Sequence, residues 1–124
     1  MNIIISNSSS IPIYEQIKTA IKQAIFSNEL KEEDMLPSVR SMANDLKISF
    51  LTVKRAYDEL EEEGYIKTVQ GKGSFVAPKN LELIKEEKLW EIQELIEKIY
   101  DISKISNITE DEIKELFKII FNEN

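Results

Sequence analysis

One stretch, residues 36–76, limits the fold of this chain more than any other feature. Apolar residues first recur at helical spacing over residues 39–46, behind Ser38, a favourable N-cap residue. After a polar turn, a second helix is predicted to begin at Ser49. It should end near Gly64, because glycine readily adopts the left-handed conformation that terminates helices. The stretch therefore predicts two helices joined by a tight turn.

Two β-rich runs follow this helix pair, residues 65–69 and 74–76. Between them lies Gln70-Gly71-Lys72-Gly73, a hairpin signal with two glycines. A hairpin placed directly after two such helices is a wing, so the stretch predicts a winged helix-turn-helix. In docked motifs of this type, the first turns of the second helix face base edges in the major groove of DNA.

Helical spacing also predicts the elements on either side of this stretch. Residues 12–27 read as one core helix, and Ile3-Ile4-Ile5 before it as a short strand or an apolar strap. Beyond Pro78, a long helix is predicted over about residues 81–103. A short linker over residues 104–108 should join it to a last helix.

The last helix has its own start signal. Thr109-Glu110-Asp111-Glu112 is a capping box, and Ile108 against Ile113 would form a hydrophobic staple. We therefore predict a mainly α protein with a small β-hairpin wing. Its two parts would be a winged helix-turn-helix DNA-binding domain over residues 1–77 and a two-helix dimerisation tail over residues 78–124.

Composition argues against most other classes of protein. The chain has no cysteine and no histidine, so it lacks disulfides, thiolate metal sites and the usual general base. Its acids occur in runs such as Glu32-Glu33-Asp34 and Glu61-Glu62-Glu63, which we expect to be solvated surface. No window has the apolar length of a membrane span. The first residues include neither a basic n-region nor a long apolar h-region, so we expect no secretory signal. We expect a cytoplasmic protein that is not an enzyme and uses no metal or cofactor.

The net charge of −7 argues against a nucleic-acid partner, but its distribution does not. Residues 79–124 hold 7 lysines and 12 acids, a net charge of −5. By contrast, residues 46–57 and residues 64–79 each contain three basic residues and no acid. A DNA-binding protein needs positive charge where the phosphates lie rather than a positive total.

The residues predicted to face DNA occupy the helix pair and the tip of the hairpin. They are Ser38, Arg40, Ser49, Phe50, Leu51, Thr52, Lys54, Arg55, Gln70, Gly71 and Lys72. Several of them have open alternatives. Gln70, Gly71 and Lys72 either contact the minor groove or its phosphates or form a merely exposed turn. Phe50 either extends the core face of its helix or faces DNA, and one of Phe50 and Leu51 is a candidate for contact with a thymine methyl group. Arg40 either binds a phosphate or forms a surface ion pair with Asp45 or an acid of the 32–34 run.

The same residues carry a resemblance to a known family. The chain is similar to GntR-type bacterial transcription regulators over about residues 11–77, in the motifs Leu36-Pro37-Ser38-x-Arg40, Thr52-Val53-x-Arg55-Ala56-Tyr57-x-x-Leu60, Gly64 and Gln70-Gly71-Lys72-Gly73-Ser74-Phe75-Val76. The short remainder resembles the tail of the YtrA-like subfamily, which mainly dimerises. The resemblance implies that Arg40, the start of the second helix and Gly71 face DNA.

Four positions differ from the usual pattern of the family. Phe50 stands where a basic or polar residue is common, which bears directly on base recognition. Glu32-Glu33 stand where Pro-Gly is usual, and Asn28 stands where Gly is common. The two loop differences are expected to alter geometry locally rather than function.

We therefore expect a regulator, most simply a repressor, that binds double-stranded DNA at a palindromic operator as a homodimer. Its dimerisation face would consist of Leu89, Ile92, Ile96, Ile99, Ile113, Leu116, Phe117, Ile120 and Phe121, unless these pack back on residues 1–30. No polar cluster marks a pocket for a small-molecule effector; the junction of the two parts is the expected place. The rival hypothesis is a protein–protein interaction module built on a winged-helix scaffold that binds no DNA.

Overall fold

The computed structural model describes residues 1–78 and 81–123 of the chain. The chain divides into two compact units, Met1–Glu82 and Leu83–Asn124.

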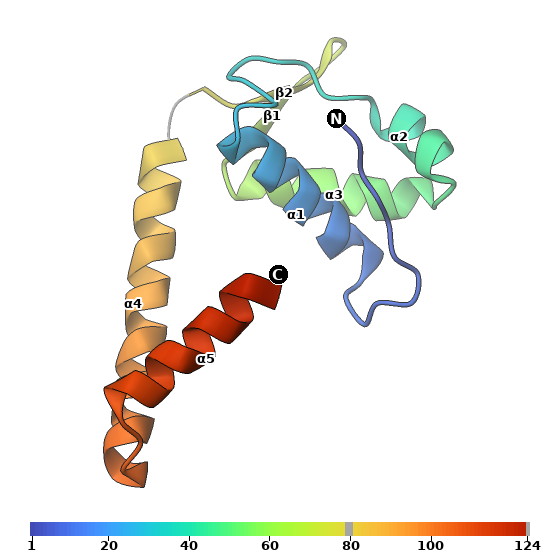
Figure 1. Ribbon diagram of the computed structural model, residues 1–124. Coiled ribbons are helices and arrows are strands. Elements are labelled where there is room, and N and C mark those ends of the chain that lie inside the picture. Colours follow the sequence, from blue (N-terminus) through green and yellow to red (C-terminus); the bar gives the residue numbers. More distant parts are fainter. Residues whose placement is uncertain (79–80, 124) are drawn as a thin grey trace. The chain divides into compact units, whose positions relative to one another are not determined.

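The first unit is a winged helix-turn-helix, as the sequence predicts. Figure 1 shows its elements in chain order, and α3 lies at the centre, where it packs against α1, α2 and β1. The elements are α1 (Ile13–Phe26), α2 (Val39–Leu46), α3 (Phe50–Glu62), β1 (Ile66–Val69) and β2 (Gly73–Val76). The start of α3 therefore lies beside α2, and the hairpin begins where α3 ends.

The core of the first unit comes from the apolar stripes of these elements. One stripe of α1 and one stripe of α3 are buried against each other, because residues three and four apart share a helix face. The fully buried large side chains are Ile17, Ile21, Ile25, Val53, Leu60, Ile66 and Val76. Ala43 and Met42 add the buried face of α2.

The hairpin has a third, strand-like edge beside its two strands. β1 and β2 pair antiparallel from Ile66 opposite Val76 to Val69 opposite Gly73. The preceding loop adds a third, strand-like edge, because Met35 forms a bridge with Phe75 and the Leu36 N–H donates to the Ser74 carbonyl at 2.8 Å. The loop before α2 therefore secures the wing.

Before α1 the chain forms a strap rather than a strand; no strand is assigned within residues 1–12. The Gln16 side chain holds the strap in place. Its amide oxygen accepts from the Ser6 N–H at 2.8 Å, and its amide nitrogen donates to the Ser6 and Ile11 carbonyls. Ile3 lines a small pocket together with Pro37 and Met42, so the strap passes near α2.

The second unit contains most of α4 (Leu81–Ser106) and α5 (Glu110–Glu123). The prediction that the long helix ends at Ser103 was wrong by three residues. Asn107 adopts the left-handed conformation (φ 56°), and the Ile108 N–H donates to the Ser103 carbonyl at 2.9 Å. This is a Schellman-type ending, and it satisfies a carbonyl that would otherwise be unpaired at the helix end.

The start of α5 confirms the predicted capping box. The Glu112 N–H donates to Thr109 Oγ1 at 3.2 Å, and the Thr109 N–H donates back to the Glu112 carboxylate at 3.4 Å. Ile108 and Ile113 line the same cleft between α4 and α5. None of the helices in the described ranges is long and apolar enough to cross a membrane.

Candidate DNA-binding surface

The first turns of α3 present their outer side chains to solvent. The stripe Val53, Ala56, Tyr57 and Leu60 is buried, so the opposite face of the helix is free for a partner. Leu51 is 72% exposed and Phe50 is 42% exposed, while Thr52 is half-buried. Lys54 and Arg55 are also exposed.

Phe50 lies at the surface, beside Arg40, and not in the core. The Arg40 guanidinium carbon stands 5.5 Å from the centroid of the Phe50 ring, within the range of a cation–π contact. Glu33, one of the acids of the 32–34 run, pairs with Lys67. The contact between Arg40 and Phe50 joins the start of α2 to the start of α3 and keeps the guanidinium at the surface.

The two basic residues of α3 differ in what holds them. Lys54 Nζ lies 2.9 Å from the carboxylate of Asp58, one turn further on, in an exposed pair that costs little to break. Arg55 Nε donates to Glu59 at 3.0 Å, and its guanidinium lies only 3.7 Å from the centre of the Tyr14 ring. Arg55 is therefore fixed against α1, whereas Lys54 can turn to a new partner.

Each helix of the motif begins at a serine whose hydroxyl caps its first turn. Ser38 Oγ accepts from the Ser41 N–H at 3.0 Å, and Ser49 Oγ accepts from the Leu51 N–H at 3.1 Å. Both are predicted DNA-facing residues, and both remain exposed as N-caps. Lys47 links the two helices in the left-handed conformation (φ 56°).

Tyr57 fixes the orientation of α3 against α2. Its hydroxyl donates to the Pro37 carbonyl at 2.6 Å, directly before the cap of α2, and approaches the Met42 sulfur at 3.9 Å. Burial raises the pKa of the Tyr57 hydroxyl, so it remains a neutral donor. A single buried side chain thus holds both helices of the motif.

A buried lysine joins α1 to the second half of α3. Lys18 is 5% exposed, and its Nζ lies 2.8 Å from Glu59 and 2.6 Å from Glu63. Burial by itself would lower the pKa of Lys18, but the hydrogen bonds to both carboxylates outweigh it and raise that pKa. Sequence reasoning missed this cluster, because Lys18 lies beside the apolar stripe of α1 and nothing in the sequence marks its partners.

The acid run at the end of α3 was predicted to be solvated surface, but two of its glutamates have partners within the first unit. Burial tends to raise the pKa of Glu63, but hydrogen bonds from Lys18 and Lys22 hold it below its usual value. The hydrogen bond from Lys18 likewise lowers the pKa of Glu59. Glu61 accepts from the Thr68 N–H at 2.8 Å and so ties the helix to the wing. These acids therefore have structural partners, and they lie toward the C-terminal end of α3, away from the turns that are predicted to face DNA.

The tip of the wing is exposed and built on a glycine. Gln70, Gly71 and Lys72 are exposed, and the Lys72 N–H donates to the Val69 carbonyl to close the turn. Gly71 has a φ of 81°, which an L side chain rarely adopts. The tip therefore presents backbone, the Gln70 side chain and one lysine, a surface that suits contact with phosphates.

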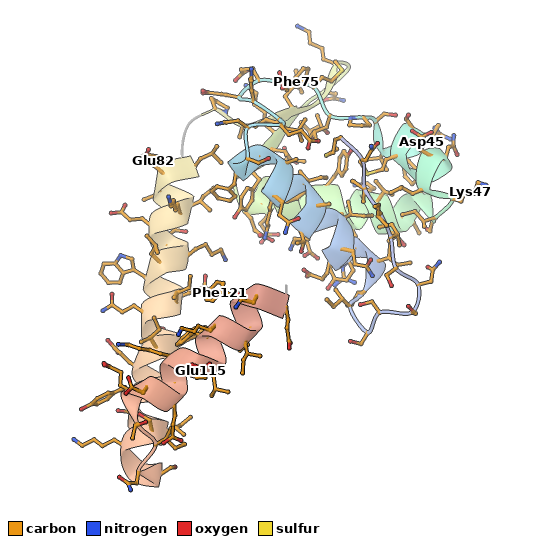
Figure 2. The ribbon with its side chains drawn as sticks, in the orientation of Figure 1. Asp45, Lys47, Phe75, Glu82, Glu115 and Phe121 are labelled. Carbon is orange, nitrogen blue, oxygen red and sulfur yellow. The ribbon has the colours of Figure 1, made fainter. Side chains whose placement is uncertain are left out.

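One further cation belongs to this surface although the predicted set omits it. Lys47 is exposed in the turn between α2 and α3, and Figure 2 shows it projecting at the outer edge of α2. It lies in the acid-free window of residues 46–57, which was the available signal. Lys79 of the second basic window lies outside the described residues.

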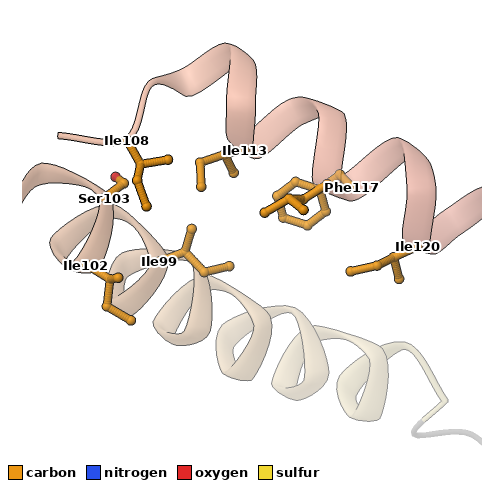
Figure 3. Close-up of a pocket in the computed structure, with 8 residues that line it drawn as sticks. Ile99, Ile102, Ser103, Ile108, Ile113, Phe117 and Ile120 are labelled. Atoms are coloured by element: carbon orange, nitrogen blue, oxygen red, sulfur yellow. The ribbon is translucent and has the colours of Figure 1, made fainter. Parts of the chain in front are cut away.

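A second surface is formed by the apolar faces of α4 and α5. Figure 3 shows Ile99 of α4 pointing toward Ile113 and Phe117 of α5 across a cleft that Ile102 and Ile120 also line. The cleft has a volume of about 300 Å³, and Ser103 supplies its single hydroxyl within the described ranges. Phe117 and Phe121 stack with ring centres 6.3 Å apart. The described residues hold no cluster of three acids that would suit a metal ion.

Known proteins of the same fold include regulators matched over nearly the whole chain. The transcriptional repressor YtrA of Bacillus subtilis is 33% identical over 90% of this chain and 86% of its own length. The solved structure of YtrA from Sulfolobus acidocaldarius, described as a GntR-family transcription factor, has a TM-score of 0.61 and 35% identity over 98% of this chain and 97% of that chain. The DNA-binding domain of AraR, solved in complex with an operator, has a TM-score of 0.56 and 25% identity over 62% of this chain and 96% of that chain.

The family model for bacterial regulatory proteins of the gntR family matches residues 13–76, which are the helices and wing of the first unit. The match confirms the resemblance drawn from the motifs of α2, α3 and the wing. Proteins of this family regulate transcription by binding DNA and are not enzymes. The chain is a GntR-family transcription regulator, with a winged helix-turn-helix and a short helical tail like that of the YtrA-type members.

Proposed function

We propose that the chain is a cytoplasmic repressor that binds a palindromic operator as a homodimer. The start of α3 enters the major groove, Arg40 and Lys54 bind phosphates or base edges, and the wing tip meets the adjacent backbone. One observation carries this proposal. On a chain of net charge −7, the exposed side chains of the first turns of α3 include two cations and no acid before Asp58.

The homodimer is supported by the second unit. Apart from Ile84, none of its described residues is buried, yet its two helices contain many large apolar side chains. Exposed apolar patches of this extent are uncommon on monomers, and a second copy of the tail would cover them. Pairing would also multiply the affinity of two modest DNA-binding surfaces.

The DNA-binding part of the proposal is tested with fragments selected from the source genome by the wild-type protein. Fluorescence anisotropy should give an affinity that falls steeply with salt, because cations on the protein release counterions from DNA. Arg40→Ala and Lys54→Ala should each weaken binding about tenfold or more. Lys114→Ala is the matched control, since it removes an exposed lysine paired with Glu110 on α5.

The control should bind DNA like the wild type. Selection of no fragment, or binding that salt does not weaken, would overturn the proposal in favour of a protein-interaction module. Equal losses in all three variants would show that net charge rather than this surface governs binding.

The dimer is tested separately by sedimentation equilibrium of the full chain without DNA. A dimer at micromolar concentration is expected, and Phe117→Asp should convert it to a monomer because a carboxylate would be buried at the interface. A wild-type chain that remains monomeric throughout this range would contradict the homodimer while leaving DNA binding intact.

A further inference from the structure

We infer that Leu51 is a specificity-determining residue that recognises the methyl group of a thymine in each half of the operator. This inference rests on the proposed DNA-binding function and names the base that the protein prefers. It follows from where Leu51 lies on α3, from what surrounds it and from the chemistry of the major groove.

Leu51 occupies the outermost position of the first turn of α3. At 3.6 residues per turn it stands about 160° around the helix from Val53, which is fully buried. Its own side chain is 72% exposed, although its backbone is fixed by the hydrogen bond from its N–H to Ser49 Oγ. An apolar side chain on a rigid backbone therefore stands where a base edge would approach.

The side chains of Phe50 and Arg55, close to Leu51 in α3, already have partners within the protein. Leu51 is therefore the apolar side chain that remains available to a base. The Phe50 ring lies under the Arg40 guanidinium, and the Arg55 guanidinium lies over the Tyr14 ring. Lys54 is held by one exposed carboxylate, from which it can move to a phosphate. The cations thus flank Leu51, and they favour a polyanion rather than an apolar protein partner.

The major groove contains one apolar group that distinguishes bases, the C5-methyl group of thymine. Other base edges present donors and acceptors there, and a leucine cannot pair with them. Placing Leu51 against a donor or acceptor would leave that polar group without water or a partner, which is unfavourable. Contact with a thymine methyl instead removes apolar surface of both groups from water.

The inference is tested with synthetic duplexes of a selected operator in which thymines are replaced one at a time by deoxyuridine. This substitution keeps base pairing and removes only the methyl group. One symmetric pair of thymines should be sensitive, with affinity falling about fourfold for one half-site, the effect of exposing one methyl-sized group. Replacement in both half-sites should lower affinity about 15-fold.

Two protein variants test whether the sensitivity to deoxyuridine arises from the Leu51 side chain. Leu51→Ala should bind the thymine and uracil duplexes equally, because its methyl contact is lost. Ile4→Ala is the matched control, since it truncates an apolar side chain that is 91% exposed on the same unit, and it should retain the full discrimination.

Three results would overturn the inference while leaving the proposed function intact. Sensitivity to deoxyuridine that persists in Leu51→Ala would assign it to DNA shape or to another residue. Salt-dependent operator binding with no sensitive thymine would remove the methyl contact altogether. Loss of discrimination in Ile4→Ala would show that the effect is not local to α3. Failure to select any operator would instead overturn the proposed function.

Discussion

The two units of the chain contain similar proportions of apolar residues but use them in opposite ways. In the first unit the stripes of α1, α2 and α3 face one another and are buried. In the second unit the stripes of α4 and α5 stay largely exposed, and Ile84 alone among its described residues is buried. A unit with a closed core is stable by itself, whereas a unit with open apolar faces needs a partner.

The exposed apolar surface of the second unit is widest on α4. Ile92 and Ile99 lie on one side of the helix, and Leu89 and Ile96 lie close beside them, so the apolar surface is wide. α5 contributes one stripe of its own, and the cleft between the two helices stays open. In the proposed homodimer, a second copy of this unit would supply the apolar surface that closes the cleft.

The largest predicted effect tests the closed core. Leu60→Ala should lower the free energy of unfolding by about 2–5 kcal/mol, because Leu60 is fully buried in α3 and the change leaves a cavity. Urea unfolding followed by circular dichroism measures it. The loss should be the same at low and high protein concentration. A loss below about 1 kcal/mol would show that the first unit is less tightly packed than its burial indicates.

The second unit, whose apolar faces are exposed, should respond differently when a leucine is truncated to alanine. Leu116→Ala truncates a leucine that is exposed in a single copy, so the unfolding of a dilute monomer should shift by less than about 0.5 kcal/mol. The dimer dissociation constant should rise about tenfold or more, since both copies lose apolar contact. Sedimentation and urea unfolding over a range of concentrations separate the two effects. Equal destabilisation at every concentration would contradict the comparison.

The Lys18 cluster offers a smaller test within the first unit. Lys18→Met should destabilise it by about 1–3 kcal/mol, because Glu59 and Glu63 lose a charged donor that is shielded from water. Lys22→Met is the matched control; its Nζ pairs with Glu63 but is more exposed, so a loss below about 1 kcal/mol is expected. Similar losses in both variants would show that burial of Lys18 adds nothing.

The same cluster predicts how stability depends on pH. The folded-state pKa values of Glu59 and Glu63 lie below 4.5, so their contribution is present above pH 4.5 and is lost as pH falls through those values. The pKa of Lys18 is raised above 10.5, so its contribution is complete below that pH and is lost only as pH rises well above it. Urea midpoints should fall in acid, and less so in Lys18→Met. An identical acid profile in both proteins would contradict this.

The smallest effect concerns the loop that secures the wing. Glu33 has a φ of 71°, at the place where the family commonly has glycine, so Glu33→Gly should stabilise the unit by about 0.5–1 kcal/mol. Its N–H bond to the Val76 carbonyl is kept. Glu33→Ala is the control for the lost ion pair with Lys67 and should not stabilise. Thermal unfolding measures both; a gain in the alanine variant would rule out the backbone explanation.

Much of the fold could be predicted because its signals are local. Ser38 and Ser49 mark helix starts, Gly64 marks an end, and the two glycines of the wing mark a turn. The Asn107 ending was missed although the residue type was visible, because asparagine is a weaker signal than glycine. Lys18 could not be found, since its partners lie more than 40 residues away on α3.

The sequence by itself determined the family, the helix-turn-helix, the wing and the candidate residues, because spacing and capping act over a few residues. Tertiary structure alone decided the state of each candidate. It placed Phe50 under Arg40, fixed Arg55 against Tyr14 and left Leu51 outermost on α3. Such pairings depend on which helix faces pack together, and packing brings together residues that the sequence keeps apart.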